Sequence, residues 1–168
     1  VAVADNVSTL QNVTVTVNVL SNDQPGTDAT LDRGSVELNG SAKKLTVAGQ
    51  GTYTVQPTGS VEFDPLPGFR GKASPVSYRV ADSDGNHATS TLSMTVTPVN
   101  PVAVNDSAIT PYGHAITVNV PANDKPGDAS APLKPASVVV KDAAGQFGKT
   151  MTRAGEGTYA VDAYGAMT

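Results

Sequence analysis

The sequence predicts an all-β fold, and three observations support this prediction. Val and Thr, which are β-branched and suit a pleated strand better than a helix, supply 23 and 19 of the 168 residues. Short segments of alternating apolar and polar residues are separated by turn formers, and no segment shows a helical period. The chain also repeats itself after about 100 residues.

The internal repeat is clearest between residues 1–26 and residues 102–127. Thirteen of these 26 aligned pairs are identical, at a constant offset of 101. The similarity continues, with small insertions, from GSVEL to ASVVV and from LTVAGQGTYTV to MTRAGEGTYAV. We therefore expect one complete repeat at residues 1–98, a short linker at 99–101 and a second repeat at 102–168.

The linker and the end of the second repeat each lead to an expectation. Pro98 and Pro101 restrict the backbone on both sides of the linker, so we expect a short, stiff connection. Thr168 aligns with Glu62, so the counterpart of residues 63–98 is missing from the second repeat. We expect either that the natural chain is longer or that a neighbouring molecule supplies these strands by swapping or strand addition.

Alternation and turn residues predict the strands of the first repeat in order. After an initial strand that begins near Asp5, Val alternates with Thr and Asn over residues 13–19, which predicts a strand that ends at the turn SNDQPG. Two shorter strands are expected at 35–38 and 43–47, joined by Asn39 and Gly40, a favoured hairpin pair.

The second half of the repeat contains two further pairs of strands. We expect strands at 52–56 and 60–63 around the turn Pro-Thr-Gly, and strands at 75–81 and 88–97 joined by DSDGN. Seven or eight short strands with frequent turns indicate an immunoglobulin-like β-sandwich. The predicted architecture is therefore a tandem of immunoglobulin-like β-sandwich repeats, the second incomplete at its C-terminus.

Composition excludes several classes of function. The chain has 11 basic and 15 acidic residues, and the basic ones are scattered, so we expect no nucleic-acid partner. No apolar run is long enough to cross a membrane, so we expect no membrane partner. The absence of Cys excludes disulfides, thiolate zinc sites and thiol catalysis, and is compatible with export from a bacterium.

An ordered series of motifs extends through the whole first repeat. It comprises VAVAD at 1–5, TVNVLSND at 16–23, LTVAGQGTYTVQP at 45–57, GSVEFDPLPGFRG at 59–71 and PVSYRV…TVTP at 75–98. This order resembles the CshA-type fibril repeat of Gram-positive bacterial surface adhesins. The resemblance implies an extracellular stalk module of the cell wall that projects an adhesive tip. Its implied partners are neighbouring repeats and other fibril subunits, while other domains contact the host surface. A swapped copy is the partner expected if a neighbouring molecule supplies the missing strands.

The sequence gives little support for catalysis. Only His87 and His114 have a side-chain pKa suited to a general base, and neither has a histidine counterpart in the other repeat. Three Glu residues show no pairing typical of a glycosidase. We therefore expect no catalytic residues and no enzyme activity.

Calcium is the candidate cofactor, because oxygen-bearing side chains are expected to gather at one pole of each repeat. The candidate ligands are Asp5, Asn22, Asp23, Asp82 and Asp84 of the first repeat, and Asn100, Asp106, Asn123 and Asp124 at the second. The alternative is turn chemistry, since Asx turns and tight hairpins use the same residue types. If turn chemistry is the whole explanation, the chain has no cofactor.

A second functional class, an adhesive or carbohydrate- or protein-binding module, stays open beside the stalk. Such modules commonly present aromatic platforms, and this chain has three Phe, five Tyr and no Trp. Tyr112 and Tyr164 are the candidates outside the repeat pattern, and they are too sparse to form such a platform.

Overall fold

The computed structural model describes residues 1–129 and 131–168, and these form two compact units, Val1–Val99 and Asn100–Thr168. The described residues contain many strands and, as helix, only two single turns of 3-10 type, η1 (Val120–Ala122) and η2 (Pro135–Ser137). In this part of the chain no helix is long and apolar enough to cross a membrane. The all-β prediction is confirmed.

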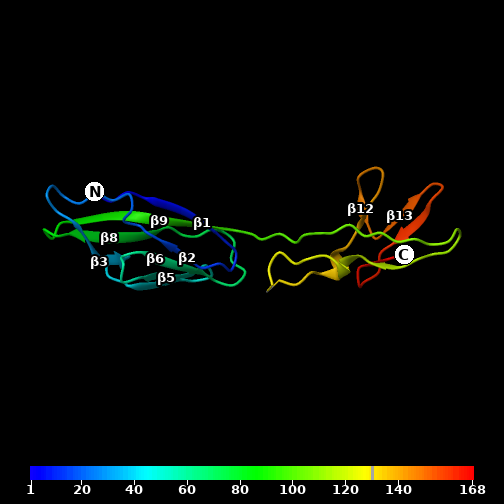
Figure 1. Ribbon diagram of the computed structural model, residues 1–168, viewed down its shortest axis with the longest axis horizontal. Coiled ribbons are helices and arrows are strands. Elements are labelled where there is room, and N and C mark those ends of the chain that lie inside the picture. The colour runs from blue at the N-terminus through cyan, green and yellow to red at the C-terminus, as the bar shows by residue number, and fades with distance from the viewer. Residues whose placement is uncertain (130) are drawn as a thin grey trace. The chain divides into compact units, whose positions relative to one another are not determined.

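Unit one is built from two sheets that enclose one core (Figure 1). Its strands are β1 (Asp5–Leu10), β2 (Val15–Val17), β3 (Leu31–Leu38), β4 (Lys44–Val47), β5 (Gly51–Val55), β6 (Val61–Pro65), β7 (Gly71–Lys72), β8 (Val76–Asp82) and β9 (His87–Thr97). One sheet has the order β1-β9-β8-β3, with β7 also paired to β9, and the other has the order β2-β6-β5-β4. This arrangement is a β-sandwich.

The core of unit one follows from the alternation of its strands, because every second side chain points between the sheets. Its fully buried side chains come from both sheets. The sheet that contains β3, β8 and β9 contributes Val36, Leu38, Val76, Tyr78, Val80, Leu92, Met94 and Val96. The other sheet contributes Tyr53, Val61 and Phe63, and Val19 follows β2. The rings of Tyr53 and Phe63 lie 4.5 Å apart. Medium-sized apolar residues thus fill a thin core without Trp.

Two predicted pairs of strands are confirmed with their turns. β5 pairs antiparallel with β6, and β8 pairs antiparallel with β9 through the predicted turn that follows Asp82. A feature that local patterns did not predict is the parallel pairing of β1 with β9, which sets Asp5 opposite Leu92 and Leu10 opposite Thr97. The first and last strands of unit one are therefore neighbours.

The strand expected over residues 13–19 is wrong in its length, because only Val15–Val17 pairs with β6. Turns limit it at both ends: the Val13 amide donates to the Leu10 carbonyl, and the Ser21 amide donates to the Asn18 carbonyl. Val19 is nevertheless fully buried, so the alternation of apolar and polar residues predicts burial correctly beyond the end of the paired strand.

The expected hairpin at Asn39 and Gly40 is also corrected. Both residues have positive φ, 44° and 102°, as a tight turn requires, and a single bridge joins Leu38 to Ala42. However, β3 pairs with β8 whereas β4 pairs with β5, so the turn carries the chain from one sheet to the other. β3 is also longer than expected, since it begins at Leu31.

Unit two forms shorter strands, β10 (Val118–Asn119), β11 (Val140–Lys141), β12 (Phe147–Gly148), β13 (Thr150–Arg153), β14 (Gly157–Ala160) and β15 (Ala166–Met167). β13 pairs with β14 as β4 pairs with β5, and β10 pairs with β15 as β2 pairs with β6. The bridged hydroxyls of Thr46 and Thr52 in unit one also have a counterpart in Thr152 and Thr158. The short β11–β12 hairpin, in which Val140 pairs with Gly148, corresponds to the single bridge between Leu38 and Ala42 in unit one.

Candidate functional site

The most concentrated polar site of unit one surrounds the hydroxyl of Tyr78, a fully buried residue of β8. This oxygen lies 2.9 Å from the Val3 carbonyl, 3.1 Å from the Val19 carbonyl, and 3.0 and 3.1 Å from the two carboxylate oxygens of Asp23. Since a phenol carries one proton, acceptors outnumber donors here. We call Tyr78, Asp23 and Asp5 the tyrosine-carboxylate cluster.

Asp23 connects this cluster to the N-terminal segment. Its carboxylate accepts the Val3 amide at 2.7 Å, and Asn22 donates its side-chain amide to the Val3 and Ala4 carbonyls at 3.5 Å. Beside it, the Gln24 amide donates to the Val1 carbonyl at 2.8 Å. Asp5, Asn22 and Asp23 therefore lie together, but Asp82 and Asp84, which were predicted to join them, make none of these contacts. The Asn22 and Asp23 side chains fix the N-terminal segment to the loop after β2.

Asp5 is the third member of the cluster and starts β1. It is 8% exposed, and its Oδ2 atom is buried without a hydrogen-bond partner among the described residues. Burial raises the pKa of Asp5, and the charge of Asp23 adds to this effect, against hydrogen bonds with Tyr78 and Asn22 that lower it. Burial likewise raises the pKa of Tyr78, and both carboxylates act in the same direction, so the phenol stays protonated.

Asp82 serves a different purpose, at the turn between β8 and β9. Its carboxylate accepts the amides of Asp84 and Asn86 at 3.1 and 2.9 Å, and the Gly26 amide at 3.2 Å. Burial opposes ionisation, but these hydrogen bonds outweigh it and lower the pKa of Asp82. Asp84 is exposed at the same turn. The Asp82 contacts are those of an Asx turn, with one additional contact to the preceding loop.

The predicted residues of unit two show part of the same pattern. Asp124 accepts the Val104 amide at 2.8 Å, as Asp23 accepts that of Val3, and Asn123 donates to the Asn105 carbonyl at 3.3 Å. Asp106 and Asn100 are exposed. Within the described residues, no group of three or more His, Cys, Asp or Glu is arranged to hold a metal ion. Calcium binding is not tested by these contacts and stays a prediction.

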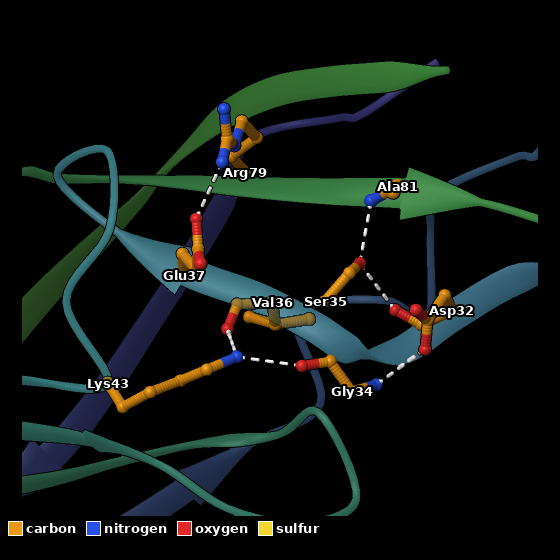
Figure 2. A network of polar contacts seen from close by, with 8 residues as sticks. All are labelled: Asp32, Gly34, Ser35, Val36, Glu37, Lys43, Arg79 and Ala81. Carbon is orange, nitrogen blue, oxygen red and sulfur yellow. Dashed lines mark hydrogen bonds and ion pairs between the residues drawn. The ribbon is translucent and has the colours of Figure 1, made fainter. Parts of the chain in front are cut away.

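A second polar network supports an irregular stretch of β3 and was not foreseen from the sequence (Figure 2). The register between β3 and β8 shifts between Asp32 and Glu37, so the residues between them lack regular ladder partners. The ammonium of Lys43 donates to the Gly34 carbonyl at 2.7 Å and to the Val36 carbonyl. We call this arrangement the lysine clamp.

Side chains on β3 complete the network. Ser35 donates to the Asp32 carbonyl and accepts the Ala81 amide, both at 2.7 Å, so its hydroxyl replaces a ladder carbonyl. Glu37 and Arg79 form an ion pair at 2.7 Å across β3 and β8. Side chains therefore satisfy main-chain groups that the register shift leaves unpaired.

The lysine clamp recurs in unit two, where Lys149 donates to the Ala136 carbonyl at 2.7 Å and to the Val138 carbonyl. Lys43 and Lys149 occupy equivalent positions of the repeat, so the alignment contained a signal for this contact. Tyr78 had no such signal, because residues 102–168 align only with residues 1–62 and so do not reach its position.

The remaining candidates do not form a reactive group. His87 and His114 are exposed in different units, and Lys141, the lysine that follows the apolar run VVV, lies 5.5 Å from the ring of Phe147. A hollow of about 800 Å³ is an open surface of unit two lined by residues that include Tyr112, Tyr159 and Met167.

The comparisons with known proteins identify a family for residues 1–96. The family model of the surface adhesin CshA repetitive domain matches residues 1–96, more than half of the chain. Neither the curated proteins nor the solved structures provide a match to the chain. The matched residues cover nearly all of unit one, including the tyrosine-carboxylate cluster, the Asx turn and the lysine clamp.

Proposed function

Because the chain belongs to the family of surface adhesin CshA repetitive domains, we propose that it is a stalk module of a bacterial cell-surface adhesin. In this role tandem immunoglobulin-like β-sandwiches project an adhesive tip from the cell wall and space it from the cell. The family is one of non-enzymatic surface proteins, and its name gives the cell-surface location. The stalk role and the projected tip are our proposals.

The observation that carries the proposal is the use of charged side chains in unit one. Asp23, Asp82 and Lys43 form hydrogen bonds with main-chain groups of their own unit. Asp124 and Lys149 make the corresponding contacts in unit two. A module whose charged groups fix loops and irregular strands, and do so twice along the chain, suits a repeated spacer.

The experiment that tests the stalk role measures the reach of a tip. Arrays of two, four and eight copies of residues 1–101 are anchored to a cell wall and carry the same epitope at the outer end. A flexible Gly/Ser linker with the same number of residues serves as the matched control, because its mean reach grows only with the square root of its length.

The expected result is a wall-to-epitope distance that grows in proportion to the number of copies, whereas the control follows the square root. A distance that follows the control, or that does not grow, contradicts the stalk proposal. If the array without a tip adheres to host cells as strongly as the whole adhesin does, the module is the adhesive part and not the spacer.

A calcium ion at the tyrosine-carboxylate cluster is a separate proposal. It is supported by the buried Asp5 Oδ2 atom, which has no hydrogen-bond partner among the described residues. A second carboxylate, that of Asp23, lies beside it. Calcium prefers such oxygen ligands. Millimolar calcium is then expected to raise the thermal midpoint of unit one, and Asp5→Asn to abolish the increase. An unchanged midpoint in the original chain would leave turn chemistry as the full account.

A further inference from the structure

The outer side of β3 is an edge of its sheet. Among the described residues the strand order is β1-β9-β8-β3, so β3 pairs with β8 on one side only. An edge strand presents main-chain donors and acceptors on which a second chain can pair, unless loops or side chains cover them. What covers this side of β3 therefore decides whether two copies of the chain can join there.

Main-chain groups of Val36 and Leu38 point away from β8, toward this outer side. The amide of Asn39 donates to the Ser77 carbonyl of β8 at 2.9 Å. Leu38, the residue before it, faces the opposite way and exchanges two main-chain hydrogen bonds with Ala42. Since the direction of these groups alternates along a strand, the Val36 carbonyl lies on the same outer side as Leu38.

Two different contacts close the rest of this edge. The ammonium of Lys43 donates to the Val36 carbonyl and, at 2.7 Å, to the Gly34 carbonyl (Figure 2). The turn after β5 covers the residue before them, because a Cβ atom at Gly59, whose φ is 79°, would lie 2.8 Å from the Arg33 carbonyl oxygen. Only a glycine lets the turn approach the β3 backbone so closely. A charged side chain and a turn thus cover the main chain that a further strand would need.

Unit two repeats both contacts. Lys149 donates to the Ala136 and Val138 carbonyls, and Gly165, also with a φ of 79°, would place a Cβ atom 2.8 Å from the Pro135 carbonyl oxygen. Pro and Ala stand at these covered positions where unit one has Arg and Gly. The lysine and the glycine therefore recur together although the side chains of the residues that they cover differ.

We propose that the lysine clamp keeps the outer side of β3 from pairing with the same edge of a second copy of this chain. Two identical edges can pair antiparallel about a twofold axis, and this pairing needs the carbonyls that Lys43 occupies. A second strand would take both acceptors from Lys43 and bury its ammonium, which is costly for a charge without partners. Modules linked in one chain meet at a high effective concentration, so a closed edge in each unit keeps them separate.

The test compares the self-association of full-chain variants by sedimentation velocity over a wide range of protein concentrations. The double variant Lys43→Met/Lys149→Met opens both edges, and we expect it to associate at least about 10-fold more tightly than the original chain. Slower amide hydrogen exchange at residues 33–37 and 136–139 should accompany the association. Lys44→Met/Lys134→Met is the matched control, because it removes the same charges at exposed neighbouring positions, and it should behave as the original chain does.

A further variant separates an open edge from a loss of stability. Tyr78→Phe removes the hydroxyl that four acceptors share and so destabilises unit one, but it leaves the outer side of β3 unchanged. It should not increase self-association. If the double variant does not fold, Lys149→Met alone, which leaves unit one intact, is compared with Lys134→Met.

Association that is confined to the clamp variants and protects the opened edge supports the proposal. No increase in association, equal association of Tyr78→Phe or the lysine controls, or association without slower exchange at the opened edge overturns it. These outcomes do not affect the stalk experiment, which measures the reach of an array and not the pairing of its edges.

Discussion

Replacing Tyr78 by Phe tests the role of the tyrosine-carboxylate cluster, and Tyr53 provides a matched control within the same core. Both tyrosines are fully buried, and both substitutions remove one hydroxyl. The Tyr78 hydroxyl has four acceptors within 3.1 Å, including both oxygens of Asp23. The Tyr53 hydroxyl is buried without a partner among the described residues, and burial raises the pKa of Tyr53 to about 12.

The expected losses differ because a hydrogen bond to a charged group contributes about 1.5–3 kcal/mol, and a buried acceptor that loses its donor adds a penalty. Asp23 is only 5% exposed, so water does not readily replace the phenol. We expect Tyr78→Phe to lower the free energy of unfolding of unit one by about 2–4 kcal/mol. Tyr53→Phe should leave it unchanged or raise it by about 1 kcal/mol, since it removes an unsatisfied buried group.

Calorimetry of the full chain measures these changes, and hydrogen exchange at β5 and β8 assigns the transition to unit one. For a unit of this size, the Tyr78→Phe loss corresponds to a midpoint lowered by about 10–20 °C. Equal effects of the two substitutions would refute the reasoning, because the argument depends on the difference in hydrogen bonding and not on the loss of a hydroxyl.

Three further substitutions test the other polar groups. Lys43→Met should lower the free energy of unfolding, measured by urea titration, by about 1–3 kcal/mol, because two carbonyls lose a charged donor. Lys44→Met, at the neighbouring exposed position, should change it little. The pKa of Asp5 is raised, so ionisation of this side chain lowers the free energy of unfolding as pH rises above 3.8. Asp5→Asn should therefore flatten this part of the pH profile and increase stability near pH 7. The pKa of Asp82 is lowered, so the stability that this carboxylate adds is present above pH 3.8 and is lost as pH falls. In the same titrations, Asp82→Asn should reduce the free energy of unfolding at neutral pH and weaken its decrease in acid.

Controls separate these effects from general damage to the fold. A Lys44→Met variant as destabilised as Lys43→Met would show that charge at β4, and not the lysine clamp, is responsible. For Asp5, a steeper pH dependence after substitution would contradict the assigned direction of its pKa. For Asp82, an unchanged neutral stability would mean that the three amides find other acceptors.

Local sequence patterns were sufficient where neighbouring residues alone determine the structure. The β5–β6 and β8–β9 pairs follow from alternation on either side of a tight turn, and the all-β class follows from composition. The pattern at 13–19 also identified Val17 and Val19 as buried, although the paired strand is shorter. In these places short-range signals and tertiary structure agree.

Contacts between distant segments could not be predicted in this way. The parallel pairing of β1 with β9 joins residues more than 80 positions apart, and no local signal specifies its register. The turn at Asn39 was recognised, but the destination of the next strand depends on which sheet offers an unpaired edge. Of the carboxylates predicted to gather at the N-terminal pole, Asp5 and Asp23 meet at the Tyr78 hydroxyl, which comes from late in the repeat, whereas Asp82 accepts the amides of its own turn.

The parallel pairing of β1 and β9 has a consequence for a chain that is pulled from its ends. The N-terminal segment enters at Asp5, opposite Leu92, and the chain leaves β9 at Thr97, opposite Leu10. Tension applied to the two ends therefore acts along the strands in opposite directions. It loads all six register pairs in shear, so their hydrogen bonds must break together and not one after another as in peeling. The β1–β9 pair is thus arranged to resist tension that is applied to the two ends of unit one.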